Sequence, residues 1–218
     1  MTHWLLVLAL GLSACGGKKE DKAPEVAPVA AKEPSRAAGF WKWFSEHAAD
    51  LHKNTDMRAV MESISAELEK AYPGVFAEIG KTGDEMLLVI SADGIQKLFP
   101  QVQEVYAARP TVPGWKIVAF RQREAGFAVE MNGTKLEPKT VKFVGTPAGA
   151  KLDVEIFLPG YKADDEELKK IGYLLLDHTI GEYDMETKIG GIDFAALSAA
   201  PATAKPLSEL PAMVDAMK

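Results

Sequence analysis

The sequence predicts an α+β fold: a mainly antiparallel sheet with packed helices in a single domain. Several segments carry apolar residues at helical spacing, as in amphipathic helices. Short runs of β-branched and aromatic residues are separated by Gly-rich turns, as in hairpins. These runs follow one another instead of alternating singly with helices, which argues against a doubly wound sheet. The expected order of elements is ααββαβββ(β)αβα.

The N-terminus has the pattern of a bacterial lipoprotein signal. An uncharged apolar run, residues 4–12, leads into Leu12-Ser13-Ala14-Cys15, and Gly16 follows. The run is about half of the roughly 20 residues that a membrane-spanning helix needs. Only His3 stands where a basic residue is usual, and a start codon placed elsewhere would explain this. Residues 1–14 are therefore predicted to be a signal peptide, and Cys15 the lipidated first residue of the mature chain.

Residues 15–38 are predicted to be a disordered tether that carries a folded domain over residues 39–218. From Gly16 to Ala38 the chain mixes charges of both signs with Ala, Val and three prolines, and it holds no aromatic residue, Leu or Ile. Such a segment cannot bury enough apolar surface to fold. As a flexible coil it would span roughly 25–30 Å.

Two helices are expected first in the domain. The helix over residues 39–53 has an apolar stripe that includes Phe40, Phe44 and His47 and is flanked by tryptophans. The stripe favours core packing with a packed His47; an interfacial helix pressed into the membrane is the alternative. The second helix runs over 56–72 and ends at Pro73-Gly74.

A hairpin, a third helix and a strand are expected next. The strands over 75–80 and 86–91 flank a turn at 81–84, and the second of them is apolar on both faces, as an inner strand would be. The helix reaches about Arg109 with a kink or restart at Pro100, and a strand follows over 115–120.

The C-terminal part is expected to begin with two hairpins. Asn132-Gly133 favours a type I′ turn between strands 127–131 and 134–136, and strands 141–144 and 152–158 form the next pair. The remaining expected elements are a helix over 164–180 ended by Gly181, a strand over 183–189, and a short helix bearing Leu210 and Val214.

The composition of the chain argues against several classes of function. A single cysteine leaves the mature domain without disulfides, Cys-based zinc or iron–sulfur sites, or a thiol nucleophile. Lys and Arg number 25 against 31 Asp and Glu, a net charge of −6, so a nucleic-acid partner is not expected. No P-loop, nucleophile elbow, dinucleotide fingerprint or zincin motif occurs, and His47 and His52 are five apart, which does not suit a helical zinc pair. We expect no cofactor and no metal.

Two acidic strand faces are the most interesting polar feature. Asp153 and Glu155 share one face of their strand, and Glu182, Asp184 and Glu186 share a face of the expected strand around Tyr183. If these strands are neighbours, the carboxylates gather and could bind a basic protein surface or a hard cation, or act as a paired acid and base. The simpler interpretation is the solvated face of a one-sided sheet.

Three further charged groups have structural explanations. Arg121 and Arg123 share a predicted strand face and could contact an anion, although a salt-bridge role is favoured. The acidic run 164–167 is expected in the first turn of a helix, where the helix dipole stabilises carboxylates. His178 is expected to be a cation near a helix end.

Several segments together resemble a family of uncharacterised bacterial α+β proteins that begin with a Phe-Trp-x-Trp-Phe helix. The likeness covers nearly everything from Phe40 to Lys218, and it implies the α+β fold but no known activity and no catalytic residue. The order of elements is also similar to the α+β sandwich of the ribonuclease E regulator B type. The segments that carry the likeness are Phe40-Trp41-Lys42-Trp43-Phe44, Ile90-Ser91-Ala92-Asp93-Gly94, Trp115-Lys116-Ile117-Val118-Ala119-Phe120-Arg121, Leu158-Pro159-Gly160-Tyr161, Ile171-Gly172-Tyr173-Leu174-Leu175-Leu176-Asp177 and Gly181-Glu182-Tyr183-Asp184.

The functional expectation is a lipid-anchored cell-envelope protein, most simply a non-enzymatic module that binds a basic protein partner. Gly16 after the cysteine favours the outer membrane, with the domain facing the periplasm. The alternative is a carboxylate-based hydrolase or cation-binding protein that uses the acidic strand faces. A purely structural envelope spacer is a third possibility.

Overall fold

The structure, a computed structural model, describes residues 36–131, 133–163 and 165–217. The predicted signal peptide, Cys15, nearly all of the predicted tether, Asn132 and Asp164 lie outside the described residues. The α+β class is confirmed, and the described residues form one compact unit. Within this unit the buried side chains form two hydrophobic cores instead of the single core that the length favours.

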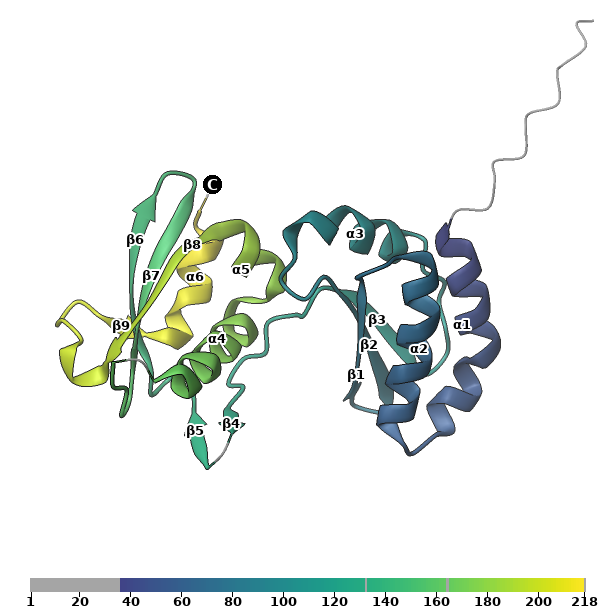
Figure 1. Cartoon of the computed structure of the whole chain (residues 1–218), viewed down its shortest axis with the longest axis horizontal. Coiled ribbons are helices and arrows are strands. Elements are labelled where there is room, and N and C mark those ends of the chain that lie inside the picture. The colour runs from purple at the N-terminus through teal and green to yellow at the C-terminus, as the bar shows by residue number, and fades with distance from the viewer. Residues whose placement is uncertain (1–35, 132, 164, 218) are drawn as a thin grey trace, which may run out of the picture. The chain divides into compact units, whose positions relative to one another are not determined.

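The first core lies between three helices and one face of a three-stranded sheet (Figure 1). The sheet order is β1-β2-β3; the first pair is antiparallel and the second parallel. On β2, Met86, Leu88 and Ile90 point into the core, while Leu87 and Val89 belong to the opposite face. The elements are α1 (Arg36–Lys53), α2 (Met57–Ala71), β1 (Phe76–Thr82), β2 (Glu85–Ser91), α3 (Phe99–Ala107) and β3 (Trp115–Ala119).

Most sequence-based boundaries in this part are confirmed. Asp56 caps α2 by accepting a hydrogen bond from the Ala59 N–H at 3.1 Å, and β2 is the inner strand. Pro100 lies in the first turn of α3, directly after the short 3-10 helix Gln96–Leu98, so the chain restarts there.

Helix α1 begins earlier than predicted because its first turn is held by side chains. Arg36 donates to Glu104 at 3.0 Å and lies over the Tyr72 ring, while Ala37 is fully buried. The aromatic stripe is confirmed as core, since Phe44 is fully buried. The packed position predicted for His47 is wrong: this residue is exposed, and its ring stacks on the partly buried Trp43.

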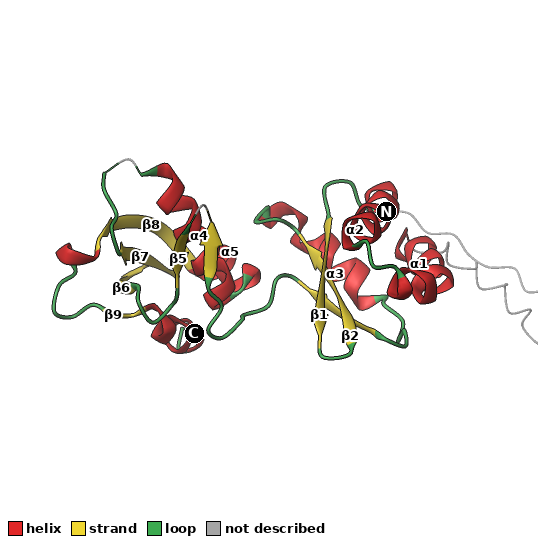
Figure 2. Ribbon diagram, turned by 90° about the horizontal axis from the view of Figure 1, so that it is seen from below, coloured by secondary structure: helices red, strands yellow, loops and turns green. Residues whose placement is uncertain are grey.

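The second core lies between helices and one face of the sheet β8-β7-β6-β9 (Figures 1 and 2). β6 and β7 form the predicted hairpin, and the crossover from β7 to its parallel neighbour β8 carries α4 and α5. A separate hairpin pairs β4 with β5 around the predicted turn. The elements are β4 (Val129–Met131), β5 (Thr134–Leu136), β6 (Lys142–Ala148), β7 (Lys151–Leu158), α4 (Glu166–Ile180), α5 (Glu182–Lys188), β8 (Ile189–Ala196), β9 (Lys205–Pro206) and α6 (Leu210–Asp215).

The strand predicted over 183–189 is wrong, because this segment is the helix α5. Acidic residues occupy its first turn and Lys188 its last, an order that the helix dipole favours. Asp184 and Lys188 also pair at 3.1 Å, one helical turn apart. The last long strand, β8, starts only at Ile189.

Candidate functional site

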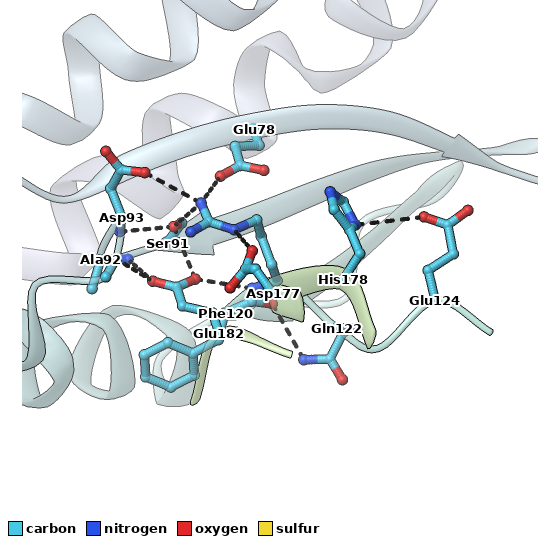
Figure 3. A network of polar contacts seen from close by, with 12 residues as sticks. Glu78, Ser91, Ala92, Asp93, Phe120, Gln122, Glu124, Asp177, His178 and Glu182 are labelled. Carbon is cyan, nitrogen blue, oxygen red and sulfur yellow. Dashed lines mark hydrogen bonds and ion pairs between the residues drawn. The ribbon is translucent and has the colours of Figure 1, made fainter. Parts of the chain in front are cut away.

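The most connected polar cluster lies where β2 and β3 end. Because these strands are parallel, their carboxyl ends meet at the same edge of the sheet. Ser91 closes β2, and Arg121 follows β3 by two residues. The start of α5 brings Glu182 to the same place, and the end of α4 brings Asp177 (Figure 3). We call the side chains of Glu78, Ser91, Asp93, Arg121, Asp177 and Glu182 the Arg121 cluster.

Glu182 is fully buried, and its carboxylate is saturated with donors. One oxygen accepts from the Ser91 hydroxyl at 2.9 Å and from the Arg121 N–H at 3.0 Å. The other accepts from the N–H groups of Ala92 at 2.8 Å and Gly94 at 3.3 Å. Ser91 is also fully buried. Neither group faces solvent, as an acid or a nucleophile would have to in order to meet a substrate.

Arg121 is shared among several acidic side chains. Its Nε donates to Asp177 at 2.6 Å, and its Nη1 donates to Glu78 at 2.6 Å and to the Ser91 hydroxyl at 3.1 Å. Burial opposes the charge of Arg121, but Asp177 and Glu78 outweigh this and raise its pKa above the ordinary value. Burial raises the pKa of Asp177 despite the contact with Arg121, and Glu182 adds to that rise.

Backbone strain is concentrated at this cluster. Asp93 and Phe120 are the non-glycine residues with positive φ among the described residues, at 49° and 61°. For a bulky residue such as Phe120 this conformation is an outlier that costs on the order of 1–3 kcal/mol. Its N–H donates to the Ile90 carbonyl at 2.8 Å, and its ring packs against Phe99 and Tyr183. These contacts hold the turn that directs Arg121 toward its partners.

A cleft of about 470 Å³ borders the cluster on the face of the first sheet away from α1 and α2. The sheet provides an apolar floor with Gly80, Leu87, Val89 and Val118. Polar walls include Glu78, Arg121 and His178. The volume suits a small ligand, but Glu78 and Arg121 are already paired with each other.

Arg121 and Arg123, the two candidate anion contacts, form salt bridges, which is the role that the sequence favoured. They lie on the loop after β3 and not on a strand face. Arg123 donates to Asp184 at 2.5 Å, to Asp215 at 2.7 and 2.9 Å, and to the Ile180 carbonyl at 2.9 Å. Asp215 raises the pKa of Arg123 despite partial burial, with Asp184 acting in the same direction.

The five predicted acidic residues divide into two groups. Glu182, Asp184 and Glu186 belong to α5, so the strand face assigned to them does not exist. Glu182 is saturated, Asp184 is paired, and burial raises the pKa of Glu186.

Asp153 and Glu155 lie exposed on β7, on the face opposite the second core, as predicted. Asp193 of the neighbouring strand β8 lies directly opposite Glu155 in the strand register. Asp153 also accepts a hydrogen bond from the Gly191 N–H at 2.6 Å. We call Asp153, Glu155 and Asp193 the acidic face.

The remaining polar predictions are structural. Asp165 caps α4 by accepting from the Leu168 N–H at 3.0 Å. His178 in the last turn of α4 stacks on Phe127 and lies 3.9 Å from Glu124. Over the described ranges, no group of three or more His, Cys, Asp or Glu is placed to hold a metal ion.

Sequence reasoning missed Glu78, Ser91, Asp177 and Asp193. The partners of Arg121 are far from it along the chain, so no local pattern connects them. A signal for Asp193 did exist, since Ile192, Asp193 and Phe194 alternate as a one-sided strand does.

Comparison with protein-family models found no match to this chain. Searches of curated proteins and of solved structures also returned no match. Among the described helices, none is long and apolar enough to cross a membrane.

Proposed function

We propose that this protein is a non-enzymatic binding module that a lipid on Cys15 anchors in the bacterial cell envelope, and that the acidic face is its recognition surface. The proposal depends on one observation: these carboxylates are exposed on the face of β7 and β8 that lies away from the second core. The core side chains of β7 point toward α4 and α6, and Asp153 and Glu155 point the other way.

Charge supports a basic protein partner. Asp177 and Asp184 are neutralised inside the molecule by arginines. The acidic face presents carboxylates to solvent, and such a patch steers and orients a positively charged partner. The saturated Glu182 and the buried Ser91 support a binding role over catalysis.

The anchor rests on the sequence pattern ending at Cys15. Mass spectrometry of the intact protein from a bacterial envelope is expected to show a chain that starts at Cys15 and carries acyl groups. A Cys15→Ala variant should lose the lipid mass and leave the membrane fraction. A native protein that retains Met1 without lipid would refute the anchor and leave the binding module untouched.

Affinity capture from detergent-solubilised envelope tests the recognition surface. The protein is expected to retain a basic partner that the variant Asp153→Lys/Glu155→Lys/Asp193→Lys loses, by at least tenfold. Glu46→Lys is the control, since Glu46 is an exposed acidic residue on α1. Equal capture by the triple variant would refute the acidic face as the binding surface.

A further inference from the structure

Among the described residues, no strand pairs with one edge of β8. It is the outermost strand in the order β8-β7-β6-β9 and pairs with β7 along its other edge. Of its residues only Ile189 is buried. Beyond an irregularity at its start, Ile192–Ala196 runs in regular register with Val154–Leu158. A regular, accessible edge presents unpaired N–H and C=O groups to which another strand can bind.

Beyond the irregularity at its start and the single charge of Asp193, β8 has little of the usual protection of an edge strand. Natural edges are blocked by lysine or proline or are kept very short. The edge strands of the first sheet carry Lys81 and Lys116, and β9 has only two residues. β8 has eight residues and no lysine, arginine or proline.

The two faces beside this edge differ in chemistry. Asp193 and Glu155 form a row on the open face. On the opposite face, Phe194 packs edge-to-face against Tyr173 of α4, a residue that is 42% exposed. A strand that binds the edge places successive side chains on alternate faces. Its residues would therefore meet carboxylates on one side and aromatic rings on the other.

We infer that β8 binds an extended basic segment of a partner protein as an additional strand of its sheet. This inference rests on the proposed function and specifies its partner. The segment alternates Lys or Arg, facing Asp193 and Glu155, with large apolar residues facing Phe194 and Tyr173. Backbone hydrogen bonds along Ile192–Ala196 supply affinity, and the alternating side chains supply specificity.

The test uses the full chain in detergent and a fluorescein-labelled peptide of alternating Lys and Val. Anisotropy is expected to show saturable binding, and amide hydrogen exchange should slow over 192–196. The same peptide, N-methylated at every second residue so that the pairing edge loses its donors, should bind at least tenfold more weakly. Asp193→Lys should weaken binding similarly, and Asp193→Asn less, whereas Glu46→Lys should leave it unchanged.

The outcomes separate this inference from the proposed function. Absence of saturable peptide binding would overturn strand addition, as would equal binding of the N-methylated peptide or protection outside β8. If envelope capture still depended on the acidic face, the proposed function would stand without strand addition. If the triple charge reversal left envelope capture unchanged, the proposed function would fail, whatever the peptide does.

Discussion

Glu182 is a fully buried acidic side chain, and the donors around it account for its burial. Replacing Glu182 with Ala would leave the Ser91 hydroxyl and the N–H groups of Ala92 and Arg121 without their acceptor. Buried donors that lose a partner cost about 1–3 kcal/mol each when water cannot reach them. We expect the free energy of unfolding of Glu182→Ala to fall by about 3 kcal/mol, as measured by urea denaturation.

Glu46→Ala is the matched control, because Glu46 is exposed on α1. Its unfolding free energy should change by less than about 0.5 kcal/mol. A Glu182→Ala loss no larger than the control's would show that water replaces the carboxylate and that the cluster does not stabilise the fold.

Tyr72 is a fully buried phenol whose hydroxyl donates to Glu104 at 2.8 Å. Burial, reinforced by the hydrogen bond to Glu104, raises the pKa of Tyr72 to about 12. In the folded state the Tyr72 hydroxyl therefore keeps its proton above pH ~10, where an ordinary tyrosine in the unfolded chain loses it. It follows that the stabilisation is complete below that pH and is lost as the pH rises toward 12.

An alkaline titration of tyrosine absorbance checks this expectation. One of the five tyrosines should ionise well after the pH range of an ordinary phenol. Tyr72→Phe should remove this late step and lower the unfolding free energy at neutral pH by about 1 kcal/mol. An unchanged titration curve in Tyr72→Phe would contradict the assignment.

At the scale of elements, Gly181 is the junction between α4 and α5. Its φ is 81°, and a Cβ there would lie 3.1 Å from the Arg121 carbonyl oxygen. Both the conformation and the backbone contact oppose a side chain, and an extended conformation with positive φ, as here with a ψ of 150°, alone costs a non-glycine residue about 1–3 kcal/mol. We expect Gly181→Ala to lower the free energy of unfolding by about 2 kcal/mol or more in urea denaturation.

Gly39→Ala provides a control with the opposite sign. Gly39 lies within α1, and a Cβ there would have no atom within 4 Å. Alanine is the better helix former, so this change should stabilise the protein by roughly 0.5–1 kcal/mol. A Gly181→Ala variant as stable as wild type would show that the α4–α5 junction can take another conformation.

Elements with strong local signals could be predicted from the sequence, and those determined by distant contacts could not. The apolar periodicity of α2 and the following Pro73-Gly74 predicted its bounds closely. Glu182–Lys188 alternates polar and apolar residues as a strand does, and this alternation masks its helical signals, which are the charge order and the preceding Gly181. Of the candidate site, the salt-bridge interpretation of the arginines was correct, but their partners depend on the tertiary fold.

For the molecule as a whole, the two hydrophobic cores share no side chain. The Arg121 cluster connects them: Glu78 and Ser91 come from the first sheet, and Asp177 and Glu182 come from the helices on the second. Tyr183 of α5 adds aromatic contacts to Phe99 and Phe120. Cooperative unfolding of both cores should therefore depend on this polar cluster more than on shared apolar packing.

Arg121→Ala tests that coupling. It would leave Asp177, whose side chain is 13% exposed, without its cation, and a broken buried pair costs about 3–5 kcal/mol. Trp41, Trp43 and Trp115 all pack on the first core, so tryptophan fluorescence reports on that core. Hydrogen exchange of β7 peptides reports on the second.

The urea transitions seen by the two probes should coincide in the wild-type protein and separate in Arg121→Ala. The control is Arg58→Ala, whose exposed pair with Glu62 contributes less than about 0.5 kcal/mol, so its transitions should stay together. Coincident transitions in Arg121→Ala would mean that the aromatic contacts of Tyr183 couple the cores without the arginine. The variant Tyr183→Ala should then separate the two transitions, because it removes the rings' contact and retains the ion pairs.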